Sequence, residues 1–189
     1  MPALDELHAA TIRDLDAAFA EIGVIGVIIG GVAVSLLASP RYTADVDSLL
    51  LYDTSEVDDL VCELERHNFR PAFSGMVDVA KQARVVAVVH ATGIRVDIAL
   101  GCLPFEEELV RRAEVHDVSG LGVRLPTLED LVIMKAIASR PKDLEDIRSI
   151  AAVHPDLDRA RIRRWVTQYG ELLDTPDLWS QIEPLIVSP

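Results

Sequence analysis

The segment IGVIIGGVAVSLLASPRYTADVDSLLL, residues 25–51, determines how the rest of the chain is interpreted. It begins with an apolar run that ends at Gly30-Gly31 and continues through a short amphipathic segment. It then turns at Ser39-Pro40-Arg41 and ends in a second apolar run that contains Asp45-Val46-Asp47. Short apolar runs are typical of buried strands, and glycine and proline mark the turns between elements. The segment therefore predicts a strand, a glycine turn, the start of a helix and a second strand with two carboxylates.

The two carboxylates of the second strand share one face. Side chains alternate between the two faces of a strand, so Asp45 and Asp47 point the same way, about 7 Å apart along the backbone. Two like charges at this distance repel each other unless a cation lies between them. Carboxylate oxygens suit Mg²⁺, so the pair predicts a magnesium site.

The two glycines predict a phosphate site close to the acids. Gly30 and Gly31 lack a Cβ atom, so the backbone can turn sharply there and a ligand can approach the main chain closely. The helix that follows begins with unpaired N–H groups and the positive end of its dipole, which together bind phosphate. A phosphate site beside a metal-binding acid pair implies a nucleoside triphosphate as ligand.

This pattern of two glycines, a spacer and Asp-x-Asp resembles the signature of the nucleotidyltransferase superfamily, whose simplest members share a polymerase-β-like core. Members usually have Gly-Ser where this chain has Gly30-Gly31, although Gly-Gly also occurs. They also carry a third carboxylate on a later strand, in a context like Val96-Asp97-Ile98. The resemblance implies that Asp97 completes the metal site of the acid pair. The residues alone leave open a solvent-facing Asp97 that pairs with Arg95 or Arg84.

Lys135 lies on the apolar stripe of a predicted helix. Thr127 caps this helix, whose apolar residues include Leu128 and Leu131. Lys135 follows Leu131 by four residues and therefore lies on the same stripe. A buried ammonium group without a partner is costly. Lys135 therefore either extends its amine into solvent or reaches an anion.

Residues Thr127 to Ile150 resemble the region after the core in AbiE-type toxin nucleotidyltransferases and their uncharacterised relatives. In that region a helix lysine is followed by a basic residue and a Lys/Arg-Asp-x-x-Asp segment. The resemblance implies that Lys135 contacts the triphosphate and that Lys142, Asp143 and Asp146 form a second nucleotide-binding motif. Asp143 and Asp146 share a helix face because they are three residues apart. The alternative is an exposed charged face on which Lys142 pairs with Asp146.

Composition limits the partners of the chain. Its 189 residues are 50% hydrophobic, which suffices for one globular domain with a substantial core. The formal net charge of -13 argues against a broad electrostatic contact with nucleic acid, but not against a local basic patch. The candidate patch consists of Arg159, Arg161, Arg163 and Arg164. It is either a face for an anionic substrate such as RNA or a solvated helix side.

The sequence predicts a cytoplasmic protein without membrane contact. Its first five residues lack the basic stretch and apolar core of a signal peptide, and the apolar run 24–37 is too short to span a bilayer. Cys62 and Cys102 do not have the spacing of a metal site, and two cysteines in a chain of this size indicate a reducing compartment. Cys62 is expected to be a small buried or half-buried side chain.

The remaining elements follow from periodicity and turn residues. A helix is expected at 4–22, and the first strand follows it at 24–29. Later helices are expected at 53–67 and 104–112, and strand pairs at 84–90 with 94–100 and at 114–118 with 122–125. Residues 68–75 are expected to form a loop, and 77–82 fit a helix or a strand. The chain is expected to be helical from 126, with its last helices at 156–169 and 176–187.

The sequence thus predicts an α/β (α+β) fold with a small mixed β-sheet nucleotidyltransferase core flanked by helices, residues 1–125. A helical C-terminal region, residues 126–189, packs on this core. The activity that the resemblance implies is metal-dependent transfer of a nucleoside monophosphate from a nucleoside triphosphate to a hydroxyl of an RNA, a protein or a small molecule. Two Mg²⁺ ions assist this transfer, and pyrophosphate is released.

Two other functions remain open at this point. One is a catalytically weak nucleotide-binding or partner-binding module of a toxin–antitoxin type system, with an antitoxin-like protein as partner. The missing serine favours this alternative, whereas the three retained acids oppose it. The other is a metal-dependent phosphohydrolase, which would release free phosphate without an adduct on a second molecule.

Overall fold

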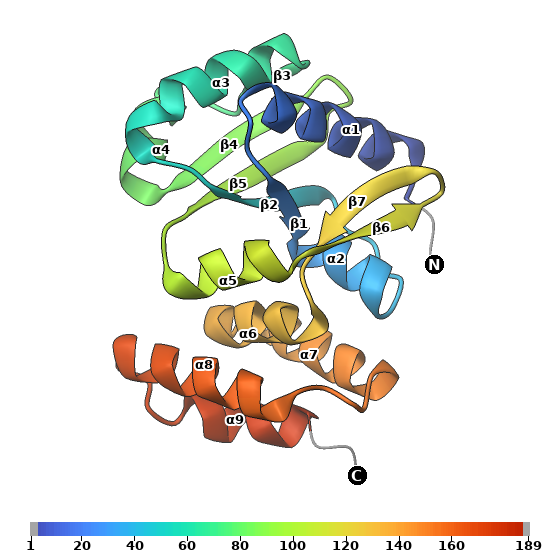
Figure 1. Cartoon of the computed structure of the whole chain (residues 1–189), viewed down its shortest axis with the longest axis vertical. Coiled ribbons are helices and arrows are strands. Elements are labelled where there is room, and N and C mark those ends of the chain that lie inside the picture. Colours follow the sequence, from blue (N-terminus) through green and yellow to red (C-terminus); the bar gives the residue numbers. More distant parts are fainter. Residues whose placement is uncertain (1–3, 187–189) are drawn as a thin grey trace.

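The computed structural model describes residues 4–186, which form a five-stranded mixed sheet and a two-stranded sheet surrounded by helices (Figure 1). The α/β fold predicted from the sequence is confirmed. Residues 1–3 and 187–189 lie outside the described part of the chain. They include part of the N-terminus that was predicted to lack a signal peptide, the end of the last predicted helix and the ends of the two predicted regions.

The main sheet places two acid-bearing strands side by side. Its spatial order is β1-β2-β5-β4-β3, and β2 pairs in parallel with β5, whereas the other neighbouring strands are antiparallel. The strands are β1 (Gly26–Ile29), β2 (Asp45–Leu51), β3 (Phe69–Pro71), β4 (Val85–His90) and β5 (Arg95–Gly101). The apolar residues of β2 and β5 are buried because helices cover the sheet.

Helices before residue 126 lie on both sides of the main sheet. They are α1 (Glu6–Glu21), α2 (Gly30–Leu37), α3 (Val57–Arg66) after a 3₁₀ turn η1 (Thr54–Glu56), α4 (Met76–Ala83) and α5 (Pro104–Arg112). In Figure 1, α1, α3 and α4 lie above the sheet, and α2 and α5 lie below it, where both contact β2. The hairpin of β6 (Glu114–Val118) and β7 (Leu121–Leu125) extends from the main sheet, with β7 against β1.

The chain after residue 126 forms a helical layer beneath α2 and α5 (Figure 1). Its helices are α6 (Leu128–Ala138), α7 (Pro141–Val153), α8 (Arg159–Leu172) and α9 (Leu178–Ile186). α6 contacts α2 of the sheet layer as well as α7 and α8. Trp165 of α8 packs against Phe105 of α5, with ring centroids 5.3 Å apart. No helix within residues 4–186 has the length and apolarity that crossing a membrane requires.

Three local predictions are corrected or decided by the structure. The expected loop 68–75 contains the short strand β3, which pairs with β4. The ambiguous segment 77–82 is part of helix α4. Cys62 is exposed, contrary to the prediction, because α3 buries Val61 and Leu64 on its other face.

Candidate active site

The chain passes from β1 into α2 without an intervening loop. Gly30 makes this turn with φ +64°, in the left-handed region that glycine adopts without steric cost. α2 begins at Gly30, and no side chain caps it. Of its first amide N–H groups, that of Gly31 interacts with the Asp47 carboxylate, and the helix dipole favours negative charge at the same place.

Strands β2 and β5 bring the three predicted acids together. Asp45 and Asp47 lie at the start of β2, and Asp97 of β5 is the direct partner of Asp47 in the parallel register. Neighbouring strands are about 4.8 Å apart, so partner side chains on one face can reach a common ligand. All three acids line one cavity, together with Gly30 and Gly31.

Asp47 is the acid whose surroundings most clearly disfavour a negative charge. Burial, followed by the neighbouring charge of Asp97 and a smaller contribution from Asp45, raises the pKa of Asp47 above its ordinary value of 3.8. The Gly31 amide and Lys135 oppose this shift without reversing it. A carboxylate crowded by like charges is stabilised by a nearby cation, and this set of oxygen donors fits a divalent ion such as Mg²⁺.

Asp97 lies among the acids but pairs with an arginine. The Arg95 guanidinium donates to both carboxylate oxygens of Asp97 at 3.0 to 3.2 Å, which is one of the pairings that the sequence left open. Arg84 instead donates to the carbonyl of Leu100. As the side chains of residues 4–186 are oriented, no three His, Cys, Asp or Glu residues form a metal-binding group. The Asp97 side chain is 30% exposed and lines the same cavity as Asp47.

Replacing Asp47 with asparagine is expected to stabilise the metal-free protein at neutral pH by on the order of 1 kcal/mol. The folded state raises the pKa of Asp47, so folding is disfavoured by its ionised form once the pH exceeds 3.8. Asparagine carries no charge and has the same shape. Urea unfolding in a chelating buffer should show the gain at pH 7 and its loss below pH 3.8, and equal stability of both proteins at pH 7 would contradict it.

Lys135 reaches anions rather than solvent. Its side chain is 6% exposed, and its Nζ lies 3.0 Å from Asp143 and 2.8 Å from Asp146. Both acids belong to α7, which begins at Pro141, shortly after α6 ends at Ala138. Lys135 thus ties α6 to α7 at the edge of the cavity.

The predicted alternative for α7, an exposed charged face with a Lys142–Asp146 pair, is wrong. Asp143 and Asp146 are buried, at 0% and 5% exposure. Arg140 donates to Asp143, whereas Arg41 pairs with Asp146 at 2.9 Å. Lys142 is exposed at the start of α7 and lines the cavity.

The buried carboxylate of Asp143 stays charged because of its cationic neighbours. Burial by itself raises the pKa of Asp143, but hydrogen bonds from Arg140 and Lys135 outweigh it and hold the pKa below 3.8. The carboxylate of Asp143 therefore remains an anion at neutral pH, next to a positively charged Lys135.

The cavity between these elements has a volume of about 310 Å³. One wall consists of the glycine turn and the three acids, and the other comes from α6 and the start of α7. Every site residue predicted from the sequence lines it except Asp146, which contacts the lining residues Arg41 and Lys135. The cavity therefore has acids on the sheet side and amines on the helix side.

Three polar residues of the cavity were not predicted from the sequence, namely Arg41, Thr43 and Arg140. Thr43 had a usable signal, because it precedes Asp45 by two residues and so continues the same face towards the cavity. Arg41 is the last residue of the predicted turn Ser39-Pro40-Arg41 and gave no local signal of a role in the site. Arg140 is the basic residue between Lys135 and the Lys142-Asp143 segment of the family resemblance, which assigned it no role of its own.

The residues of this site all lie within the part of the chain that one protein-family model matches. The model of a family described as "Nucleotidyltransferase of unknown function (DUF6036)" matches residues 11–176. The chain belongs to this family. The search of the curated proteins found no match to this nucleotidyltransferase-family chain.

Solved structures with the fold of this DUF6036 chain include three nucleotidyltransferases or similar proteins. An antigenic nucleotidyltransferase-like protein from Paracoccidioides brasiliensis is 16% identical, with a TM-score of 0.56 over 100% of this chain and 97% of that one. The antibiotic-resistance factor ANT(2'')-Ia is 14% identical, with a TM-score of 0.64 over 94% and 99%. The lincosamide antibiotic adenylyltransferase LnuA is 13% identical, with a TM-score of 0.55 over 81% and 99%. At these identities the similarity is one of fold.

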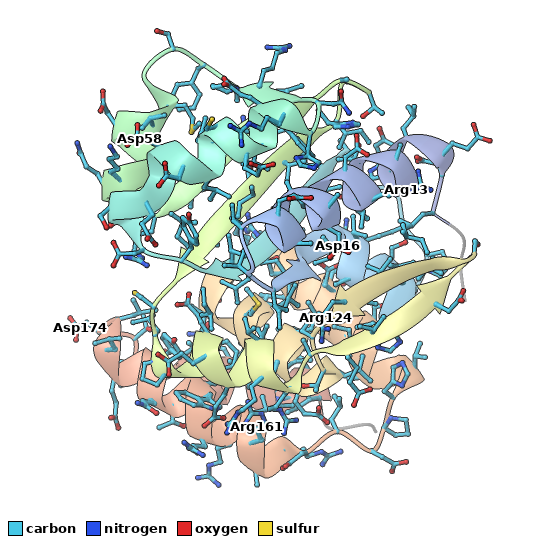
Figure 2. All side chains as sticks on the ribbon, turned by 45° about the horizontal axis from the view of Figure 1, so that its top comes forward. Arg13, Asp16, Asp58, Arg124, Arg161 and Asp174 are labelled. Atoms are coloured by element: carbon cyan, nitrogen blue, oxygen red, sulfur yellow. The ribbon has the colours of Figure 1, made fainter. Side chains whose placement is uncertain are left out.

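Of the four arginines of the candidate patch on α8 of this DUF6036 chain, Arg161 is engaged in internal ion pairs, whereas Arg159, Arg163 and Arg164 are exposed. Arg161, labelled in Figure 2, extends from α8 to Glu108 of α5 and to Asp130 of α6, both at 2.7 Å. The Arg164 guanidinium lies over the Trp165 ring, 4.8 Å from its centroid. Arg161 therefore joins three helices and belongs neither to a free anion-binding face nor to a solvated helix side.

The turn at Gly30 is expected to tolerate no side chain in this nucleotidyltransferase family member. A Cβ built on Gly30 would overlap the Asp47 carboxylate, and the positive φ adds about 1–2 kcal/mol of strain for alanine. We expect Gly30→Ala to displace Asp47 and to lower transfer about 100-fold, the usual effect of a misplacement of about 1 Å.

Gly23→Ala is the matched control for Gly30→Ala. Gly23 has a similar φ of +70° but no atom within 4 Å of the added Cβ, so it reproduces the strain without the overlap. Unfolding and transfer would be measured on both variants. Equal loss of transfer in the two variants would show that the overlap with Asp47 does not matter.

Proposed function

We propose that this chain is a metal-dependent nucleotidyltransferase that moves a nucleoside monophosphate group from a nucleoside triphosphate to a hydroxyl acceptor and releases pyrophosphate. The observation that carries the proposal is the meeting of Asp47 and Asp97, on neighbouring strands, with the uncapped start of α2 in one cavity. Family membership and the fold of the neighbouring structures support the same activity.

Asp45, Asp47 and Asp97 would hold two Mg²⁺ ions, which when bound neutralise phosphate charge and favour in-line displacement. The raised pKa of Asp47 supports this role, because a cation relieves the repulsion among the three acids. Asp97 would also orient or deprotonate the attacking hydroxyl, since a carboxylate within hydrogen-bond reach can accept that proton.

The glycine turn and the amines of the helical layer would hold the triphosphate. Gly30 and Gly31 would contribute backbone N–H groups at the start of α2, and Lys135 and Lys142 would neutralise phosphate charge from the opposite wall. Asp143 and Asp146 would serve this site through the Lys135 amine, which they contact. We propose residues 1–125 as the nucleotidyltransferase core and residues 126–189 as a helical region packed on it. Lys135 belongs to the helical region, so this region would contribute to the site on the core.

For the acceptor we propose only a chemical class. It presents a hydroxyl on an RNA, a protein or a small molecule, and the net charge of -13 makes a large RNA the least favourable of these. We also propose a relation to AbiE-type toxins, which the sequence of the segment from Lys135 to Asp146 supports. A cytoplasmic setting and an antitoxin-like protein as partner belong to the same proposal.

The test is incubation of the purified protein with each α-labelled nucleoside triphosphate, Mg²⁺ and a total cell extract. The double variant Asp45→Ala, Asp47→Ala is run alongside. Label that appears in an RNA, protein or small-molecule fraction, and is absent with the variant, would establish transfer and its acceptor class together.

The same assay distinguishes the alternatives. No transfer in any fraction, with triphosphate binding intact, would favour a nucleotide-binding or partner-binding module. Release of free phosphate from a phosphoester without any adduct would favour a phosphohydrolase. The proposal requires both an adduct and pyrophosphate.

A further inference from the structure

The space beside Gly31 is occupied by two residues from the connection between α2 and β2. A Cβ built on Gly31 would lie 2.7 Å from Thr43 Oγ1 and 3.1 Å from Arg41 Nη2. Gly31 is not among the residues with positive φ. Glycine is therefore required at position 31 by the neighbouring side chains and not by the backbone conformation.

Both neighbours carry hydrogen-bond donors at the uncapped start of α2. Arg41 and Thr43 line the same cavity as Gly31 and the acids. A guanidinium group binds phosphate through paired N–H groups, and a threonine hydroxyl can rotate its proton towards a new acceptor. The Thr43 hydroxyl now donates only to the carbonyl of Asp45, at 3.2 Å.

The position of the Arg41 guanidinium is fixed by α7. Its Nε and Nη2 donate to the two carboxylate oxygens of Asp146 at 2.9 and 3.0 Å. This bidentate pair uses one N–H of each nitrogen, and Nη1 donates one N–H to the carbonyl of Tyr42 at 3.4 Å. One N–H each of Nη1 and Nη2 therefore remains for a ligand. The Lys135 amine lies 2.8 Å from the same Asp146, which keeps this carboxylate paired when Arg41 also contacts a phosphate.

We propose that Arg41 and Thr43 are triphosphate-binding residues, which supply from the α2–β2 connection the side-chain contacts that position 31 lacks. This inference rests on the proposed function, because it assumes that a nucleoside triphosphate lies at the start of α2. It assigns the Thr43 hydroxyl and the Arg41 guanidinium to the phosphates nearest to Gly31.

An exchange of side chains between positions 31 and 43 tests the role of Thr43. Gly31→Ser alone weakens binding because its Cβ displaces Thr43 and Arg41, and Thr43→Ala alone weakens it because the hydroxyl is lost. The double variant places a hydroxyl at position 31 and removes Thr43 Oγ1, the atom nearest to the added Cβ. Arg41 Nη2 and the Cβ of residue 43, both 3.1 Å from the added Cβ, then need to move only slightly, so binding is restored. We expect each single variant to lose up to about tenfold in affinity, the usual contribution of one hydrogen bond, and the double variant to lie within about threefold of the wild type.

A set of arginine variants tests the role of Arg41. Arg41→Gln is expected to weaken binding about 10- to 100-fold, because it removes charged hydrogen bonds to phosphate. Arg41→Lys is expected to bind little more tightly than Arg41→Gln, since an ammonium lacks the paired N–H geometry. Arg148→Gln is the matched control, because Arg148 is an exposed arginine of α7 outside the cavity and should leave affinity unchanged.

The measurement is calorimetric binding of non-hydrolysable nucleoside triphosphate analogues, one for each base, with Mg²⁺ and without any acceptor. Wild-type binding with equally tight binding by Arg41→Gln and Thr43→Ala would overturn the inference and leave the proposed function intact. No binding of any analogue by the wild type would overturn both. If Arg41→Gln does not fold, Thr43→Ala still tests the inference, because it leaves the Arg41–Asp146 pair in place.

Discussion

Replacing either Asp45 or Asp47 with asparagine is expected to lower nucleotidyl transfer at least about 1,000-fold. Asparagine keeps the shape of aspartate but removes the charge that attracts a divalent cation. Metal-assisted stabilisation of a phosphoryl transition state is worth several kcal/mol, and about 4 kcal/mol corresponds to a thousandfold change in rate. The rate would be measured from incorporation of an α-labelled nucleoside monophosphate at saturating Mg²⁺.

The matched control for this prediction is Asp59→Asn. Asp59 is exposed on α3, outside the cavity, and its replacement removes one negative charge from the chain. Its transfer rate should equal that of the wild type. Because Asp47→Asn is also expected to stabilise the metal-free protein, its loss of transfer cannot come from unfolding. More than about a tenth of the wild-type rate in Asp47→Asn would rule out a metal-binding role for this acid.

The parts of the fold that the sequence predicted well are those with strong local signals. The predicted bounds of β2 (Asp45–Leu51) and α5 (Pro104–Arg112) match the structure. α5 begins with proline and has acids in its first turn, and both features favour a helix start. β3 (Phe69–Pro71) was missed because it has only three residues, includes a proline and is defined by its pairing with β4.

The site was predictable where it follows one strand and unpredictable where it depends on packing. The alternation of side chains placed Asp45 and Asp47 on one face. The position of Asp97 opposite Asp47 depends on the register of two strands about fifty residues apart, so only the resemblance to a family suggested it. Arg41 is brought to the cavity by its pair with Asp146 on α7, a contact between distant segments for which the sequence carries no periodic signal.

The network around Lys135 explains why a cavity lined by several acids and amines has a defined shape. Asp143 and Asp146 connect α7 to Lys135 of α6, and Asp146 also connects α7 to Arg41 before β2. A change in the position of α7 would therefore move both the amines and the loop that leads to the acid pair. The helical layer thus takes part in the geometry of the site on the sheet.

Lys135→Met is expected to destabilise the protein by about 3–5 kcal/mol, the usual result of removing one partner from a buried ion pair. The lysine side chain is 6% exposed, and those of Asp143 and Asp146 are 0% and 6% exposed, so both carboxylates would lose a buried cation. Methionine retains most of the apolar volume, which separates the charge effect from a packing effect. Urea unfolding at pH 7 would measure the loss.

The pH dependence and a compensating variant identify the cause of this loss. The folded protein lowers the pKa of Asp143, so the stabilisation from its ionised form is complete above 3.8 and disappears as the pH falls through the lower folded value. The difference between the wild type and Lys135→Met should therefore shrink at acidic pH. Adding Asp143→Asn and Asp146→Asn to Lys135→Met removes the negative charge that the lysine no longer balances. Because Arg140 and Arg41 then lose their acid partners, only part of the stability should return at pH 7. A triple variant no more stable than Lys135→Met would show that the lysine stabilises the fold through its packing and not through its charge.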